Sequence, residues 1–293
     1  MVKSTDERTV FALALEATPG IGRVTAGRIL RQFGGYEDVL RYPREQILLR
    51  IKGAPRADQL AEALLDEPVM RGRMHTMRER LDSFVPRRIK AFTAADARWP
   101  ESLDDLPPAH CPNVLYCYGE PALLKRSLIG FFARPPISTD PFELAQTLVR
   151  WVMSAGMHPA AGALSGFDVV VHKLAATADQ RQPSVIVASS GLAKVDTKMR
   201  PHVSAGVKAG GAFVSSFSIA HGPFPHDERE AAFVLAALSD RLIFVDSAPE
   251  TPEWEAMEWA LTTDRRVFGM GTQPWPDGVV ALADEVALAQ VLA

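Results

Sequence analysis

Four residues in the second half of the chain, Gly162, Gly166, Asp168 and His172, have types and spacing suited to holding an anion. The two glycines bracket a turn from a short apolar run into a helical pattern, where the amides that open the helix can face a phosphate. Asp168 falls in the first helical turn, where it favours the helix dipole or caps the helix. His172 follows one turn later, suited to a phosphate or to a hydrogen bond with Asp168. A structural interpretation stays open, with tight packing for the glycines and a satisfied structural role for the histidine.

A second candidate lies near the N-terminus, in the stretch "TPGIGRVTAGRIL" at residues 18–30. Pro19 fixes the start of a turn, while Gly20 and Gly22 permit positive backbone angles and expose consecutive amides at a helix start. The stretch resembles a helix-hairpin-helix motif, and a weaker copy follows at residues 51–54. The resemblance implies a grip on phosphate, with a purely structural cap as the alternative. The residues expected at this grip are Gly20, Gly22, Arg23 and Thr25.

The elements that position these residues follow from the apolar pattern. Residues 7–17 and 23–33 each place apolar side chains on one helical face. From residue 126 onward, short apolar runs alternate with helical patterns, which is typical of a doubly wound, mainly parallel sheet. Ligands of such sheets bind beyond the carboxyl ends of the strands, near the point where the strand order reverses. The strand-end loops expected there are 132–134, 163–168, 189–191, 217–228 and 246–247.

Composition and charge limit the class of protein. The chain has 293 residues, of which 47% are hydrophobic and 23% charged, as in a soluble globular chain of two domains. Cys111 and Cys117 are too few for a disulfide framework, and neither a membrane-spanning run nor a signal-peptide pattern occurs. We therefore expect a cytoplasmic protein. Residues 1–90 carry 17 Lys and Arg against 12 Asp and Glu, a net charge of +5, whereas the remainder carries 15 against 23, or −8. A polyanion is expected to be drawn to the first segment, unless this split is only drift of surface charge.

Several short motifs follow one another in a characteristic order along the chain. They are Trp99-Pro100, Leu103, Pro107-Pro108, Val114-Leu115-Tyr116 with Gly119, the run from Ala161 to His172, Gly191-Leu192, Ser215-Ser216-Phe217 and Phe224-Pro225. Together they resemble the DprA/Smf family of DNA-processing proteins over nearly the whole chain. The resemblance implies a Rossmann-like fold that binds single-stranded DNA and helps to load a RecA-type recombinase during natural transformation.

The chain also departs from the family pattern. A Gly-Ser-Arg turn of the family corresponds to Phe132-Ala133-Arg134, and its Arg-Asn pair corresponds to Asp227-Glu228, where we expect a solvent-exposed phosphate site. Two carboxylates at such a site oppose a phosphate, so an identical DNA grip is not expected. Unpaired bases are expected to stack on aromatic rings, although Phe131 or Phe132 must belong to the core. The aromatic candidates are Phe131, Phe132, Phe217 and Phe224.

Enzymatic chemistry finds little support in the sequence. No Gly-x-Ser-x-Gly elbow occurs, and residues 270–273 lack the motif of the phosphoribohydrolases on related sheets. We therefore expect a binding protein with no catalytic residues, no metal and no cofactor. Two alternatives stay open. One is a sensor that holds a nucleotide at Gly162, Gly166, Asp168 and Arg134, and the other is a scaffold that has lost its ligand and keeps a dimer or partner surface.

The resulting prediction is an α/β protein of two domains. A small all-α, helix-hairpin-helix or SAM-like domain is expected at residues 1–85, and a Rossmann-like domain at 86–293, with a lead-in segment at 91–125 and the sheet from about 126. The predicted partners are single-stranded DNA, a RecA-type recombinase and a second copy of the chain, but no membrane. The predicted DNA- or nucleotide-binding residues are Arg134, Gly162, Gly166, Asp168, His172, Gly191 and Phe224.

Overall fold

A computed structural model describes residues 6–164, 166–177 and 182–293, so Ser165 in the glycine-rich turn lies outside the described residues. The chain divides into two compact units, Met1–Trp99 with Pro107–Leu115 and Pro100–Leu106 with Tyr116–Ala293. This division falls later than the expected boundary near residue 85. The lead-in segment is also shared between the two units, because residues 107–115 pack with the helices.

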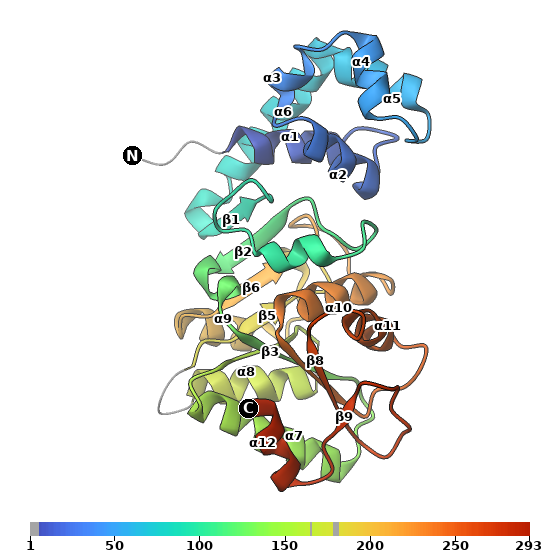
Figure 1. Cartoon of the computed structure of the whole chain (residues 1–293). Coiled ribbons are helices and arrows are strands. Elements are labelled where there is room, and N and C mark those ends of the chain that lie inside the picture. Colours follow the sequence, from blue (N-terminus) through green and yellow to red (C-terminus); the bar gives the residue numbers. More distant parts are fainter. Residues whose placement is uncertain (1–5, 165, 178–181) are drawn as a thin grey trace. The chain divides into compact units, whose positions relative to one another are not determined.

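The first unit is built from helices (Figure 1). They are α1 (Glu7–Glu16), α2 (Arg23–Gln32), α3 (Tyr36–Val39), α4 (Arg44–Arg50), α5 (Ala57–Leu65) and α6 (Glu67–Asp82), followed by the short strand β1 (Ile89–Phe92). Every residue of α1 from Thr9 to Leu15 is buried, so this helix is the centre of the unit. It packs against α2 and α6, which carry polar residues on their outer faces. The two helices predicted around the hairpin turn are confirmed as α1 and α2.

The second unit is a mainly parallel sheet covered by helices on both faces. Its strands are β2 (Leu115–Gly119), β3 (Leu128–Ala133), β4 (His158–Gly162), β5 (Val185–Val187), β6 (Ala212–Ser215), β7 (Arg241–Val245), β8 (Arg266–Met270) and β9 (Val280–Ala281). They lie in the order β2-β6-β5-β4-β3-β7-β8-β9. Strand β2 is antiparallel to β6, whereas the pairs from β6 to β9 are parallel. The predicted doubly wound α/β fold is confirmed.

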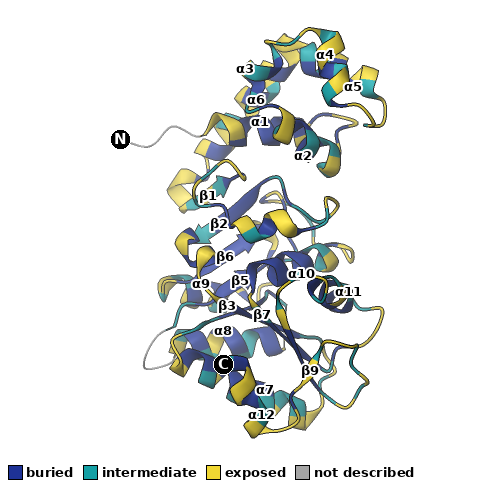
Figure 2. Cartoon of the chain, in the orientation of Figure 1, coloured by how far each residue is buried: buried dark blue, intermediate teal, exposed yellow. Residues whose placement is uncertain are grey.

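Helices follow the strands as the alternating pattern predicts as far as β8, whereas β9 and the last helix were not predicted. The helices are α7 (Thr139–Ser154), α8 (Phe167–Thr177), α9 (Arg200–Lys208), α10 (Asp227–Leu238), α11 (Pro252–Ala260) and α12 (Glu285–Leu292). Successive residues of a strand point to opposite faces, so Ile129 and Phe131 of β3 enter a core shared with α7, α8 and α12. On the other face, Gly130 leaves room for Ser239 at the end of α10. Figure 2 shows α10 and the central strands as largely buried.

The strand order brings together the carboxyl ends of three strands, β3, β4 and β5. Strand β3 starts the parallel series, with β4, β5 and β6 added on one side and β7 and β8 on the other. The direction of winding therefore reverses between β3 and β7. Helix α10 crosses over β3, β4 and β5, which brings its first turn toward the carboxyl ends of these strands. A ligand site is expected at this reversal in sheets of this class.

Candidate nucleic-acid interface

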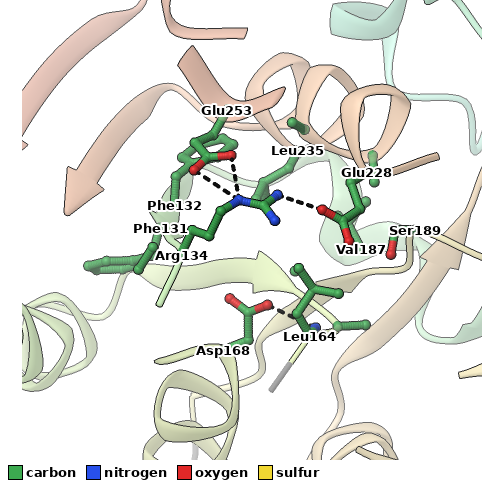
Figure 3. A pocket seen from close by; sticks show the side chains of 15 residues that line it. Phe131, Phe132, Arg134, Leu164, Asp168, Val187, Ser189, Glu228, Leu235 and Glu253 are labelled. Carbon is green, nitrogen blue, oxygen red and sulfur yellow. Dashed lines mark hydrogen bonds and ion pairs between the residues drawn. The ribbon is translucent and has the colours of Figure 1, made fainter. Parts of the chain in front are cut away.

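A small pocket lies at the carboxyl ends of β3, β4 and β5, beneath the first turns of α10 and α11 (Figure 3). Four of the five predicted strand-end loops contribute to it. Its polar lining consists of Arg134, Asp168, Ser189, Glu228 and Glu253, and its apolar lining includes Phe132, Val187 and Leu235. The cavity has a volume of about 60 Å³. This volume holds a few water molecules and is well below the roughly 300–1,000 Å³ of typical small-molecule sites.

Arg134 follows the last residue of β3 and points into this pocket between two carboxylates (Figure 3). Its Nη2 donates to Glu228 Oε2 at 2.6 Å, and its Nε donates to both carboxylate oxygens of Glu253 at 3.3 Å. Burial disfavours the charged guanidinium, but the hydrogen bond to Glu228 and the charge of Glu253 outweigh it, so the pKa of Arg134 lies above its ordinary value. The cation predicted for a phosphate is therefore already neutralised.

Asp168 lies at the floor of the pocket, in the first turn of α8. Its Oδ2 accepts the amide of Leu164 at 2.9 Å, so the carboxylate is bonded to the backbone of the turn that precedes α8. Burial raises the pKa of Asp168 to about 7, against the lowering effects of that hydrogen bond and of Arg134. Gly162 is required beside it, because a Cβ at this position would lie 2.6 Å from Asp168 Oδ2.

His172 does not reach the pocket, which corrects its prediction as a direct contact. The residue is fully buried, with Nε2 2.8 Å from the Gly162 carbonyl oxygen and Nδ1 3.3 Å from Ser184 Oγ. Burial lowers the pKa of His172 to about 4, so the ring stays neutral at physiological pH. A neutral, enclosed ring cannot hold a phosphate. Its contact with Gly162 instead fixes the end of β4 against α8, as the structural alternative proposed.

The remaining predicted glycines are set by backbone geometry. Gly166 has a φ of +84°, a conformation that favours glycine where the chain enters α8. Gly191 has its amide bonded to the carbonyl of His221, and a Cβ there would lie 2.1 Å from the Ser218 carbonyl oxygen. That amide is therefore not available to a ligand. Gly191 instead lets the loop after β5 lie directly against the loop that precedes α10.

The loop before α10 corrects the expectation of an exposed acidic pair. Asp227 is fully buried, with its carboxylate 3.0 Å from His221 Nε2 and 2.9 Å from the amide of Phe224, which donates to it. His226 Nε2 is 3.3 Å from the other carboxylate oxygen. Asp227 thus organises its own loop, and Glu228 alone of the predicted pair faces Arg134.

The four aromatic rings that were predicted to stack on bases differ in their exposure to solvent. Phe131, Phe132 and Phe217 are buried, and Phe132 stacks on Phe244 with ring centroids 4.5 Å apart, so these three are withdrawn as base-stacking residues. Phe224 is 50% exposed. Its ring lies parallel to that of His226 at a centroid distance of 5.8 Å and at right angles to His221. Half of the Phe224 side chain is therefore exposed to solvent, on a loop whose backbone is bonded to the Asp227 carboxylate.

In the first unit, the hairpin turn keeps part of its predicted form. Gly20 has a φ of +83°, whereas Gly22 has a φ of −83° and caps α2, so only the first glycine needs a positive angle. No heavy atom lies within 4 Å of a Cβ built on either glycine. Arg23 donates to the Ala109 carbonyl oxygen at 3.4 Å, which engages part of its side chain. Thr25 follows in the first turn of α2 and is half-buried.

The weaker second copy of the hairpin has the same backbone at its centre. Gly53 also has a φ of +83°, and α5 begins four residues later. Arg28 of α2 donates to the Lys52 carbonyl oxygen at 3.2 Å, which ties the two hairpins together. The residues around both turns are basic, with Arg28, Lys52 and Arg56 at or near them.

Two features of the second unit were not anticipated from the sequence. Glu253 was not identified as a site residue, although it is the most buried partner of Arg134. The strand-end loop at Asp246 points elsewhere, since its Oδ2 accepts the Ser138 amide at 2.6 Å and the residue lines a separate acidic groove with Asp140 and Asp284. The feature that could have identified Glu253 as a site residue is its position in the helix that follows β7, because β7 pairs with β3.

Two features are absent from the residues that the structure describes. No group of three or more His, Cys, Asp or Glu side chains in that part of the chain is placed to hold a metal ion. Over the same residues, no helix has the length and apolar character needed to cross a membrane.

Comparisons with known proteins agree with this geometry. The family DNA recombination-mediator protein A matches residues 90–287. Two solved structures share the fold. DNA processing protein A of Streptococcus pneumoniae has a TM-score of 0.69 and 14% identity over 98% of both chains. The protein of the same name from Helicobacter pylori, described with a single-stranded DNA binding mode, has a TM-score of 0.53 and 16% identity over 64% of this chain and 82% of that one.

No curated protein sequence matches the chain significantly. The family match nevertheless spans more than half of the chain and includes β2 to β9 with the pocket at their ends. By this match and by its strand order, the chain is a member of the DNA recombination-mediator protein A family.

Proposed function

We propose that this protein binds single-stranded DNA at the carboxyl ends of its central strands and on the loop before α10. Membership of a recombination-mediator family supports a role in handling DNA, and the Helicobacter pylori relative supplies a precedent for a single strand as the ligand. The observation that carries the proposal for this chain is the exposed ring of Phe224.

An exposed phenyl ring on a rigid loop contributes little to the core. Phe224 nevertheless has its backbone amide held by the buried carboxylate of Asp227 and its ring placed between His221 and His226. Such order keeps an aromatic face presented to solvent at small entropic cost on binding. Unpaired bases stack on such faces regardless of sequence, whereas the base faces of a duplex are covered by their neighbours.

Arg134 is proposed as the phosphate contact that accompanies this stacking. It lies at the end of β3, and its partner Glu228 is four residues beyond Phe224 in the same segment. Both contacts belong to the same strand-end region. Gly162, Gly166 and Asp168 shape this region, while His172 and Gly191 support it from within.

The tandem hairpins of the first unit are proposed as a second, weaker contact with phosphates. The support is the open turn at Gly20, its repeat at Gly53 and the surplus of basic residues in the segment. Helix-opening amides and nearby cations favour an anion. This contact would be independent of sequence.

Further aspects of the proposal rest on the family. We propose that the protein acts without catalysis and without a cofactor, passes the bound strand to a RecA-type recombinase, and works as a homodimer in the cytoplasm. The description of the family as recombination mediators supports an action on DNA together with a recombinase.

A nucleotide sensor at the same pocket is the competing function. The cavity of about 60 Å³ argues against it, because a nucleotide needs several times that volume. A scaffold without a ligand gives no reason for the ordered, exposed ring of Phe224.

Fluorescence anisotropy with a labelled oligothymidine strand tests the proposal. Phe224→Ala is expected to weaken binding by about 1 to 3 kcal/mol, the usual contribution of one stacked base, whereas Phe224→Tyr keeps the affinity. Val286→Ala, which removes an exposed apolar side chain from α12, is the matched control and leaves binding unchanged. An affinity of Phe224→Ala equal to that of the wild type contradicts the proposed site, and absence of binding by the wild type contradicts the function.

A further inference from the structure

The two carboxylates on Arg134 hold it in different ways (Figure 3). Glu253 accepts from Nε with both oxygens at 3.3 Å, whereas Glu228 accepts from Nη2 with one oxygen at 2.6 Å. The side chain of Glu253 is 7% exposed, that of Glu228 is 29% exposed, and that of Arg134 is 35% exposed. One partner is therefore enclosed with the arginine, and the other lies at its open side.

The enclosed partner cannot easily be exchanged. Removing Arg134 from Glu253 would leave a carboxylate unpaired and nearly out of contact with water, which is strongly destabilising. Glu253 is the second residue of α11, close to the helix start, and the rest of that helix is anchored by buried residues such as Trp254 and Met257. Glu253 thus fixes the direction of the guanidinium through Nε.

The open partner is exchangeable. Glu228 is the second residue of α10, and its side chain already contacts water. If its carboxylate turns away from Nη2, it gains hydration in place of the ion pair, so the loss of this partly exposed pair costs less than the loss of the enclosed one. Oxygen on a phosphodiester matches the carboxylate oxygen in charge and in its ability to accept from guanidinium N–H groups.

We propose that Glu228 is a built-in competitor that occupies the place of a DNA backbone phosphate on Arg134, and that a single strand binds by displacing it while Glu253 keeps the arginine in position. This inference rests on the proposed function and adds to it the regulation of affinity at that site. The ligand group is a phosphodiester of the strand. The Glu228 carboxylate then weakens the binding of DNA, while Glu253 keeps the guanidinium of Arg134 in the position that contacts the phosphate.

The other charged groups around Arg134 are consistent with displacement of Glu228 alone. Asp168 lines the opposite wall of the cavity, where its carboxyl is bonded to the Leu164 amide. Asp227 precedes Glu228 but has its carboxylate directed at His221 and His226, away from the arginine. A phosphate that enters from the solvent side therefore meets Glu228 first.

The test compares charge-neutral variants of the full chain by anisotropy with the labelled oligothymidine strand. Glu228→Gln is expected to raise the affinity about tenfold, equivalent to about 1.4 kcal/mol. Glu285→Gln is the matched control, because it removes the same charge from an exposed glutamate in the first turn of another helix, α12. Its affinity is expected to stay within about twofold of the wild type. Glu253→Gln is expected to gain less than Glu228→Gln, since Glu228 still occupies Nη2.

The double variant Arg134→Ala/Glu228→Gln assigns the effect to the arginine. It is expected to lose the whole gain of Glu228→Gln. Because it leaves Glu253 unpaired, the variant Arg134→Ala/Glu228→Gln/Glu253→Gln repeats the comparison, and circular dichroism checks that both variants keep the fold. A gain that persists without Arg134, or equal gains for Glu228→Gln and Glu285→Gln, overturns the inference in favour of a general charge effect. In that case the wild type still binds and still depends on Phe224, so the proposed function stands.

The source of the phosphate is tested with inorganic phosphate on the same variants. Thermal melting of Glu228→Gln is expected to respond weakly to phosphate alone, because a single ion lacks the stacking contact. Strong stabilisation by phosphate without any gain for the strand overturns the inference and assigns the site to a free anion. No strand binding by any variant, Glu228→Gln included, overturns both the inference and the proposed function.

Discussion

The hairpin turn at Gly20 and the pocket at Arg134 are both suited to hold a phosphate, but they differ in what already lies against them. The turn is open, with no heavy atom within 4 Å of a Cβ built on Gly20, and it belongs to a segment with a net charge of +5. The pocket has a better positioned cation, but two carboxylates neutralise it. A phosphate-binding residue type at a strand end is therefore not yet a phosphate site, because its charge partners decide its availability.

The largest effect that distinguishes the two regions is expected for the stability contribution of Asp168, because burial in the pocket disfavours the charged form of its carboxylate. Burial raises its pKa from 3.8 to about 7, so the folded state holds a proton that the unfolded state releases between these values. Its contribution to stability is therefore complete below about pH 4 and is lost as the pH rises toward 7.

Asp168→Asn keeps an oxygen to accept the Leu164 amide but removes this titration. At pH 8 the variant is expected to be more stable than the wild type by on the order of 4 kcal/mol, and the gap narrows as the pH falls toward 4. Chemical denaturation at several pH values measures it, with the exposed Asp264→Asn as control. A gap that is constant with pH would show that Asp168 ionises freely in the pocket.

His172 changes stability in the opposite direction and must be separated from this effect. Its pKa is lowered to about 4, so its contribution is present above pH 6.5 and is lost as the pH falls toward 4. The wild type and Asp168→Asn both retain His172. Their free energies of unfolding are therefore expected to fall in parallel with decreasing pH, once the difference caused by Asp168 has disappeared.

The sequence predicted the frame of the pocket well. Buried parallel strands are continuous apolar runs, so the ends of β3, β4 and β5, and the loops that carry Arg134, Gly162 and Asp168, could be located from the pattern alone. The glycine at 166 could also be placed, because its positive φ is a local property of the turn into α8.

The state of the pocket could not be predicted in the same way. The contact of Glu253 with Arg134 joins residues 119 positions apart and depends on β7 lying beside β3, which no local pattern specifies. The burial of Asp227 is equally non-local, because neighbouring carboxylates at the start of α10 divide between the loop interior and the pocket. Charge in a sequence motif therefore predicts chemistry less reliably than backbone pattern predicts strands.

A smaller effect is expected at the hairpin. Gly20→Val forces a β-branched residue into the left-handed region at a φ of +83°, which costs about 1 to 2 kcal/mol locally and distorts the turn. The affinity for the labelled strand is expected to fall a few-fold. Gly22→Ser is the matched control, because its φ of −83° suits any residue and serine is a good helix cap. Equal affinities of the two variants, with the fold intact, would make the hairpin a structural cap only.

The salt dependence of strand binding tests the central claim most directly, because it counts the phosphates that the protein contacts. If the strand displaces Glu228 from Arg134, the wild type and Glu228→Gln are expected to share the same slope of log Kobs against log salt, because Arg134 contacts a phosphate in both complexes. The slope is expected to be shallower by roughly 0.7 in Arg134→Ala/Glu228→Gln, the contribution of one phosphate on a single strand. Identical slopes for all three proteins would contradict a phosphate contact at Arg134.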